Sequence, residues 1–500
     1  MQRLFLSLFL LPIAVVAVAK PVEVEIAILD RATNQPIPCR VHLKDTAGKP
    51  VKAPGLPFWF DHFVCRGSVQ LLLEPGKYTI EVERGPEYRR ITDAIELKDK
   101  RRVTYELQRQ VDMAKEGWWS GELHVHRPVE DIELLMQAED LHVAPVITWW
   151  NKQNLWSQKK PPETPLVRFD GNRFYDLMAG EDEREGGALL YFSLAKPLAI
   201  TKATREYPSP MKFVEEARLM DDDVWIDIEK PFWWDIAVWL ASGRMNSIGL
   251  ANNHMCRDRM YESEAWGKPR LAERLPAPQG NGFWTQEIYY HVLDAGLRMA
   301  PSAGSASGVL PNPVGYNRVY VHVGPELTYQ KWWQGLRAGR SFVTNGPLLR
   351  VTANDKLPGH DFTGEREVVV HLKASLTSND PIRHLEIIKN GQVERKVPVQ
   401  ELAKTGSLGT LTFNDSGWFL VRAVADNKKT FRFASTAPFF VKVDGKQRIS
   451  RASAQFFLDW TRERMGRIKL DDPAQRQEVL QHHLRAEKFW QDRVANANAE

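Results

Sequence analysis

The chain has 500 residues, of which 43% are hydrophobic and 26% charged, a balance typical of a soluble globular protein. This length is too great for one core and predicts several domains. With 67 basic and 63 acidic residues, the formal charge is only +4, and no long basic run occurs. We therefore expect no nucleic-acid partner.

Residues 1–19 have the features of a secretory signal peptide. Arg3 lies near the start, an apolar stretch follows over residues 4–18, and the small-residue site Ala17-Val18-Ala19 comes before Lys20. The alternative is an uncleaved membrane anchor, for which the apolar run is short. We expect cleavage near Ala19, a secreted or periplasmic protein, and no stable membrane anchor.

Residues 20–112 consist of short runs of alternating polar and apolar residues separated by turn signals, which predicts a small antiparallel β-sandwich. The phrase at 73–80 resembles the transthyretin-like (carboxypeptidase-regulatory-like) modules that flank secreted hydrolases, and this likeness implies a structural role. Cys39 and Cys65 fall in this domain and could pair in an oxidising compartment, leaving Cys256 free. The alternative is that Cys39 and Cys65 both remain buried free thiols, and the sequence leaves the choice open.

Residues 113–348 change in character, because short apolar strands now alternate with helical stretches. Such alternation predicts a mostly parallel sheet, open or closed into a barrel, with functional groups at the C-terminal ends of its strands. We expect strands at 143–148, 188–192, 224–228, 247–250 and 318–323, and helices at 132–141, 211–220, 236–242, 286–297 and 329–338.

Residues 349–446 return to strand-like alternation and predict a second β-sandwich. The remaining residues, 447–500, form a helical tail with two amphipathic helices that have polar outer faces. We expect this tail to cap the preceding domain.

The stretch Gly117–Pro128 ends an apolar run in two histidines spaced by one residue. If residues 123–126 form a strand, His124 and His126 project from one face, while Leu123 and Val125 pack on the other. Two imidazoles that converge on one point form a metal-ligand arrangement. The alternative is a pair of half-buried histidines hydrogen-bonded to their neighbours.

Three other features follow expected strand ends: an acidic cluster at 180–185, His254, and a small-residue loop at 301–308 with room for a ligand. In the acidic cluster, strand alternation puts Glu181 and Glu183 on one face and Asp182 on the other. This alternation favours Glu181 as a ligand, with Asp182 second. A solvated charged turn is the alternative.

The order of these features resembles that of the polymerase and histidinol phosphatase (PHP) metallohydrolases, in the carbaryl hydrolase (CehA/McbA-like) branch. The likeness covers roughly residues 117–348. It depends most on residues 121–126, similar to the family's Gly-Asp-Leu-His-x-His, and on residues 338–347. It implies a multidomain chain whose central distorted (β/α)7 barrel, flanked by N-terminal and C-terminal β-sandwich domains, hydrolyses phosphoesters or carboxylic and carbamic esters with metal bound at one mouth.

Several of the family's ligand positions are changed in this chain. The family's Thr-Asp-His-Asn is Thr148-Trp149-Trp150-Asn151 here, its Gly-His pair is Gly187-Ala188, and its late Gly-Ser-Asp-x-His is the stretch 304–308. What survives suffices for one divalent ion, zinc or manganese, with an open position. Its expected ligands are His124, His126, Glu181 or Asp182, and His254.

Asp227 and Glu229 alternate onto one face of the strand at 225–229, where two carboxylates could replace a lost ligand or act as general base. A salt bridge with Lys230 or an arginine is the alternative. Arg127 is a candidate for binding an anionic substrate group, since its planar fork matches carboxylate and phosphate, or it forms only a surface pair.

Trp149 and Trp150 occupy positions of lost metal ligands. We therefore expect both rings at the mouth of the site, where they would stack on a sugar or an aromatic ring. Together with Asn151 and Ser305 they form the predicted substrate pocket.

Two functions follow from these observations. In the first, the protein is a secreted hydrolase of ester or phosphoester bonds whose metal ion lowers the pKa of water and polarises the substrate, while Glu181, Asp227 or Glu229 takes the proton. In the second, it is a non-catalytic PHP-like protein with an aromatic-lined pocket for a carbohydrate or similar ligand. Either function implies a small-molecule or carbohydrate-like partner, and both leave the oligomeric state open.

Overall fold

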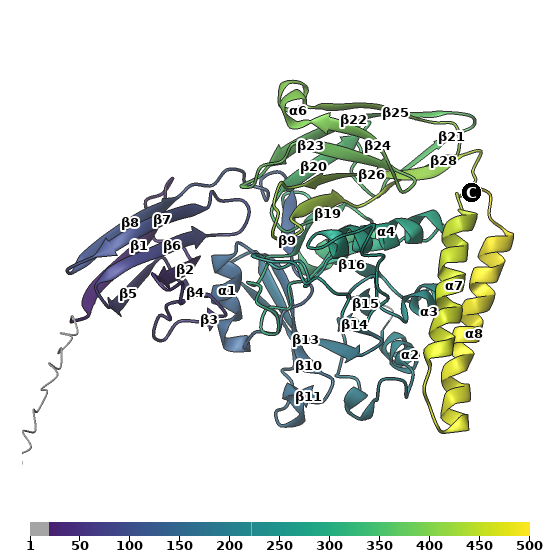
Figure 1. The fold of residues 1–500 in the computed structure, drawn as a ribbon, viewed down its shortest axis with the longest axis horizontal. Helices are drawn as coiled ribbons and strands as arrows, with labels where there is room; N and C mark the ends of the chain where they lie inside the picture. Colours follow the sequence, from purple (N-terminus) through teal and green to yellow (C-terminus); the bar gives the residue numbers. More distant parts are fainter. Residues whose placement is uncertain (1–19, 222) are drawn as a thin grey trace, which may run out of the picture.

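A computed structural model describes residues 20–221 and 223–500, and the signal peptide predicted at 1–19 lies outside the described residues. The chain is multidomain and rich in sheet: three successive units are followed by two long helices at the C-terminus (Figure 1). The N-terminal unit has a hydrophobic cluster of its own, whereas the cluster of the C-terminal unit also includes central-unit residues such as Trp118 and Phe342. Among the described residues, none of the helices is long and apolar enough to pass through a membrane.

The N-terminal unit is a sandwich of two sheets, as predicted. Strict alternation buries Val69, Leu71 and Leu73 against the second sheet and exposes the residues between them. The first sheet has the order β5-β1-β8 and the second β3-β4-β2-β6-β7. The strands are β1 (Val22–Asp30), β2 (Cys39–Asp45), β3 (Phe58–Trp59), β4 (His62–Cys65), β5 (Ser68–Leu73), β6 (Gly76–Glu83), β7 (Ile91–Leu97) and β8 (Arg101–Leu107).

Cys39 and Cys65 face each other across β2 and β4. Both are buried free thiols, and their Sγ atoms lie 3.8 Å apart. A disulfide needs about 2.05 Å between the sulfurs, so the structure shows the reduced pair. Cys256 is a third buried thiol, in the central unit.

The central unit alternates strands and helices as expected, and its five α-helices match the five predicted positions. A Ser209 side-chain cap and Pro210 at the first helical position begin α2, which illustrates why such boundaries are readable from sequence. The helices are α1 (Ile132–Ala138), α2 (Pro210–Met220), α3 (Ile236–Ala241), α4 (Gly280–Asp294) and α5 (Tyr329–Arg337). The strands are β9 (Trp118–Gly121), β10 (Val143–Trp150), β11 (Gln153–Asn154), β12 (Leu166–Phe169), β13 (Arg173–Arg184), β14 (Gly187–Phe192), β15 (Trp225–Ile228), β16 (Ser247–Ala251), β17 (Ala300–Ala303), β18 (Arg318–His322) and β19 (Ser341–Thr344).

The sheet of this unit is mixed, with parallel pairs at its centre and antiparallel pairs at β11, β12, β14, β18 and β19. The pairs β9–β10, β10–β13, β15–β16 and β16–β17 are parallel. Strand β14 runs antiparallel to both β13 and β15. The reason is local: Arg184 pairs with Gly187 across a two-residue turn, so β13 and β14 form a hairpin.

A short extended segment closes this sheet on itself. The N–H of Leu123 donates to the Ala303 carbonyl (2.9 Å), and that of His126 donates to Ser307 (2.8 Å). On the other side, the N–H of Ile147 in β10 donates to the Val125 carbonyl (2.8 Å). Residues 122–126 therefore join β10 to the continuation of β17. With the pairs β10–β13, β13–β14, β14–β15, β15–β16 and β16–β17, they complete a closed ring of strand pairings.

One glycine of the barrel is required by close packing. A Cβ added at Gly180 in β13 would lie 1.8 Å from the indole of Trp149. We expect Gly180→Ala to lower the unfolding free energy by about 1–3 kcal/mol or more, because overpacking forces side chains and backbone to shift. The exposed helical Gly466 has no neighbour within 4 Å of such a Cβ. Gly466→Ala should therefore leave the thermal melting temperature unchanged or raise it slightly, and equal destabilisation by both variants would contradict this account.

The C-terminal unit is the second predicted sandwich. Its sheet β20-β22-β25 faces a sheet that joins the central unit through the pair β19–β27. Its elements are β20 (Leu348–Ala353), β21 (Asp361–Gly364), β22 (Val368–Thr377), β23 (His384–Lys389), β24 (Gln392–Pro398), α6 (Val399–Thr405), β25 (Ser407–Phe413), β26 (Gly417–Val424), β27 (Phe433–Thr436) and β28 (Phe439–Val443).

The tail forms helices α7 (Arg451–Arg467) and α8 (Pro473–Ala495), which lie side by side (Figure 1). Both pack on the central unit, where Trp460 donates to the Trp234 carbonyl (3.1 Å) and Trp490 to that of Ala237 (3.0 Å). The tail thus covers the central unit, and not the sandwich that precedes it in the chain, because its buried tryptophans meet α3 and its flanks.

Candidate metal centre

The two histidines of the opening motif lie in the segment that closes the barrel. Residues 123–126 form two isolated bridges, both at Val125, and no regular strand, so the predicted strand is wrong as an element. The predicted alternation holds nevertheless, because Leu123 and Val125 are buried in hydrophobic clusters while the two imidazoles meet. The Nε2 atoms of His124 and His126 are 3.0 Å apart.

Glu181 of β13 completes a compact group with these histidines. Its Oε2 atom lies 3.3 Å from His124 Nε2 and 3.0 Å from His126 Nε2. Two imidazole nitrogens and one carboxylate oxygen, all directed at one another, form a donor set suited to a divalent ion such as zinc. Of the two acids considered, alternation therefore identified the one that faces the histidines.

Glu229 contacts the far side of the His124 ring, with its Oε1 3.4 Å from Nδ1. Lys230 Nζ (2.6 Å) and Trp233 Nε1 (3.1 Å) donate to the Glu229 carboxylate and hold it in place. A carboxylate that accepts from Nδ1 leaves the Nε2 lone pair directed at the site, which is the usual arrangement behind a metal-binding histidine. The predicted Glu229–Lys230 salt bridge is thus present, and Glu229 acts through His124.

The two carboxylates also control the protonation of His124. Burial lowers its pKa, but Glu181 and Glu229 outweigh that effect and raise the pKa to about 10. The same contacts lower the pKa of Glu181 and of Glu229 below their usual range, although burial alone would raise both. In the absence of an ion, the charge between the two acids is therefore that of an imidazolium.

Glu183 and Trp150 flank the group on the side of His126, and the sequence analysis did not select Glu183. The Trp150 ring meets His126 edge-on at 4.9 Å, and its Nε1 donates to Glu183 Oε2 (3.1 Å). Burial, with the nearby charge of Glu181, raises the pKa of Glu183 to about 7. The sequence feature that could have identified Glu183 is its position two residues after Glu181, on the same face of one strand.

Asp227 lies on β15 two residues before Glu229, and both carboxylates interact electrostatically with His124. Its Oδ1 accepts hydrogen bonds from the hydroxyls of Ser302 (2.5 Å) and Ser247. Burial raises its pKa to about 7. The predicted shared face of these two acids is present, with Asp227 fixed by hydroxyls and Glu229 by a cation.

Asp182 and His254, two of the predicted ligands, do not join the group. Asp182 points to the opposite face of β13 and pairs with Arg184 through two 2.7 Å contacts. His254 packs its ring on Phe232 (5.5 Å) and Tyr261 (5.4 Å). Burial and then Lys230 lower its pKa to about 3. At this site, the close ligand atoms belong to His124, His126 and Glu181.

Of the four predicted pocket residues, the structure places Trp150 beside the metal group and Trp149 in the core, so the prediction for Trp149 is wrong. Trp149 is 2% exposed and packs in the core on Tyr191, because neighbours in a strand point to opposite faces and only Trp150 turns to the site. Asn151 uses its side-chain oxygen on the backbone N–H of Glu183 (2.9 Å). Ser305 is buried, and its hydroxyl accepts from the N–H of Asn317 (2.9 Å).

Arg127 is also directed away from the metal group. Its guanidinium lies over the Trp59 ring of the N-terminal unit (5.4 Å) and 3.7 Å from Asp131. Burial lowers its pKa. The structure therefore places it in a contact between domains, one residue after His126, and not in a position to bind a substrate held by the three ligands.

No protein-family model matches the chain, and it matches no curated protein. Among solved structures it is similar to the fibronectin(III)-like modules of CbhA from Clostridium thermocellum, at 16% identity, over 27% of this chain and 67% of that chain, with a TM-score of 0.14. A likeness of this size carries no argument about the function.

Proposed function

We propose that this protein is a secreted or periplasmic hydrolase of ester or phosphoester bonds that uses one divalent metal ion, zinc or manganese, held by His124, His126 and Glu181. The observation that carries this proposal is the convergence of three ligand atoms at 3.0–3.3 Å, with Glu229 behind one imidazole. Three protein ligands with an open position are the arrangement of catalytic zinc sites.

The resemblance to the PHP metallohydrolases supports this reading. A PHP-like (β/α)7 barrel would contain a closed set of strand pairings around the site, and the pairings of β9 to β17 with residues 122–126 are consistent with that expectation. The two flanking sandwiches also agree with the domain arrangement of the branch. We propose a divergent member whose site has been reduced to one ion.

When bound, a divalent ion would supply Lewis acidity that lowers the pKa of water and polarises the substrate oxygen. The protein residues divide the remaining work. His126 is the most exposed ligand, with 8% of its side chain accessible, so substrate would approach on its side, beside Trp150. Glu183, whose pKa is about 7, is the best-placed carboxylate to take and return a proton near neutral pH.

The test combines metal analysis with an activity screen. We expect His124→Ala to lower the metal content of the purified protein by one ion per chain and to remove hydrolysis of phenyl esters, carbamates and phosphodiesters. His371→Ala, an exposed histidine of the C-terminal sandwich, is the matched control and should change neither quantity.

Unchanged metal content in folded His124→Ala protein would contradict the proposed metal site. A folded protein that holds no metal at this site and hydrolyses nothing in the screen would leave the non-catalytic binding protein as the remaining function.

A further inference from the structure

A second group of metal-ligating side chains lies in the N-terminal sandwich, on the face of its five-stranded sheet that is turned away from the core. Cys39, Val41 and Leu43 of β2 point into the sandwich, so the residues between them, including His42, lie on the other face. This face packs against the central unit: Val64 of β4 joins the hydrophobic cluster of α1. Its polar side chains are therefore buried at a domain boundary.

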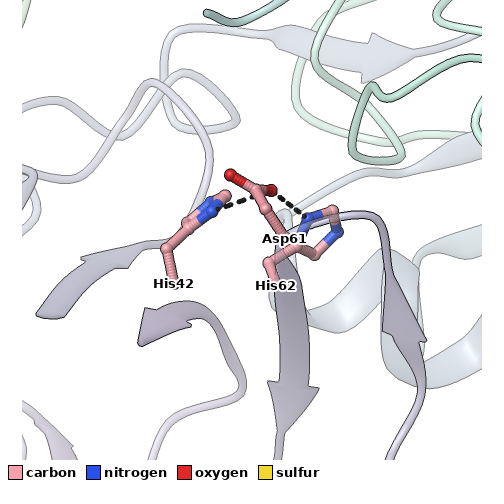
Figure 2. A group of neighbouring side chains, drawn as sticks. All are labelled: His42, Asp61 and His62. Atoms are coloured by element: carbon pink, nitrogen blue, oxygen red, sulfur yellow. Dashed lines mark hydrogen bonds and ion pairs between the residues drawn. The ribbon is translucent and has the colours of Figure 1, made fainter. Parts of the chain in front are cut away.

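Two imidazoles on this face converge on one carboxylate. Asp61 Oδ1 lies 3.1 Å from His42 Nδ1 and 3.2 Å from His62 Nδ1 (Figure 2). The two imidazole rings are 5.1 Å apart and inclined by 47°. His42 comes from β2, Asp61 from the tight turn between β3 and β4, and His62 from the start of β4, so the group links two neighbouring strands.

The imidazole of His42 is poorly satisfied by the protein alone. It is 4% exposed, and neither of its ring nitrogens makes a hydrogen bond of acceptable geometry within the described chain. Buried polar groups are nearly always hydrogen-bonded, since leaving one unpaired costs about 1–3 kcal/mol.

The surrounding charges are compatible with a cation. Glu83 Oε2 lies 3.9 Å from His42 Nε2, and Glu81 belongs to a second close group with His42. Arg40 and Arg257 are already paired with acids, Arg40 with Glu83 and Arg257 with both Glu81 and Glu83. Lys44 Nζ lies 3.1 Å from Asp61 Oδ2, where it would repel a bound cation. Its side chain is 36% exposed and flexible, so it can turn to solvent when an ion binds.

We propose that His42, Asp61 and His62 form a second cation site, with zinc as the ion that best suits two imidazoles and a carboxylate, and that its ion fastens the β3–β4 turn to β2 at the boundary with the central unit. The site is separate from the His124 group and does not depend on the proposed hydrolase activity. Its expected role is structural, because ordering this turn also orders Trp59, whose Nε1 donates to the Leu310 carbonyl of the central unit (2.8 Å).

The test uses the full chain and zinc or cobalt(II) alone as the probe. His62→Ala should lower the zinc content by one ion per chain whether His124 is present or replaced. In the His124→Ala background, added zinc should still raise the thermal melting temperature, and cobalt(II) should give the visible absorption of a nitrogen- and oxygen-ligated ion. Both responses should disappear when His62→Ala is added.

Asp61→Asn retains the shape of the turn but removes the charged ligand. It is the second test variant if His62→Ala fails to fold, and it should likewise lose the ion. His371→Ala should keep both responses. Zinc content and zinc-induced stabilisation that are the same with and without His62 and Asp61 would overturn this second site. Loss of the ion from His124→Ala alone would concern only the proposed hydrolase centre.

Discussion

Glu181→Gln is expected to lose the metal ion of the central unit and all hydrolytic activity that depends on it. Glu181 supplies the one negative charge among the three ligands, and its Oε2 is within 3.3 Å of both imidazoles. Loss of a residue that only orients a ligand costs about 10–100-fold in metal affinity, so loss of a direct anionic ligand should cost more. Zinc affinity by competition with a chelator and turnover in the activity screen measure the two effects.

Asp182→Asn provides the matched control for this experiment. Asp182 is the next residue on the same strand and equally buried, but its carboxylate pairs with Arg184 on the opposite face. Asp182→Asn should therefore keep the ion and the activity, even if it melts at a lower temperature. The reverse pattern, in which Asp182→Asn loses the ion and Glu181→Gln retains it, would mean that the assigned register of β13 is incorrect.

Arg464→Ala is expected to destabilise the protein strongly. Arg464 of α7 is buried, with Nε 2.6 Å from Asp235 and a guanidinium nitrogen 2.5 Å from Glu206. Truncating it removes the arginine from two buried carboxylates, of which Glu206 keeps only Arg205, and breaking such a buried pair typically costs about 3–5 kcal/mol. The free energy of unfolding in urea measures the loss. Arg462→Ala, on the same helix, breaks the half-exposed pair with Glu487 and should cost less than about 1 kcal/mol.

The difference in unfolding free energy between wild type and Arg464→Ala should also depend on pH. Burial alone would raise the pKa of Asp235, but Arg464 and His483 lower it below its usual range. A lowered carboxyl pKa contributes stability that is fully present above the unfolded value, about 3.9, and is lost as the pH falls through the folded value. The gap between wild type and Arg464→Ala should thus be complete at about pH 6 and shrink below about pH 4. A gap that widens in acid would contradict the ion-pair account.

Much of the fold could be predicted because its signals are local. Residues 329–338 were expected to be helical, and α5 covers Tyr329–Arg337, with the Thr328 side chain capping its first turn. Strand β13 was missed over most of its length. It is buried along nearly all of its twelve residues, Glu181 and Asp182 included, so it shows no alternation of polar and apolar side chains.

In the candidate site, too, the residues with a local sequence signal were predicted correctly and the others were not. His124, His126 and Glu181 were found because alternation along one segment decides which side chains share a face. His254 was assigned from its position after a strand, and no local pattern states that its ring would turn instead to Phe232 and Tyr261. The pairing of Trp149 with Trp150 was an error against the alternation itself, since adjacent strand residues point apart.

The segment that closes the barrel also carries two of the three proposed ligands of the central site, His124 and His126. Leu123 and His126 donate hydrogen bonds to one neighbouring strand extension, while Val125 accepts from β10. If these hydrogen bonds broke, both imidazoles would move away from Glu181 together. An ion bound there would link this segment to β13. Closure of the barrel and binding of the metal would then stabilise each other and be lost together.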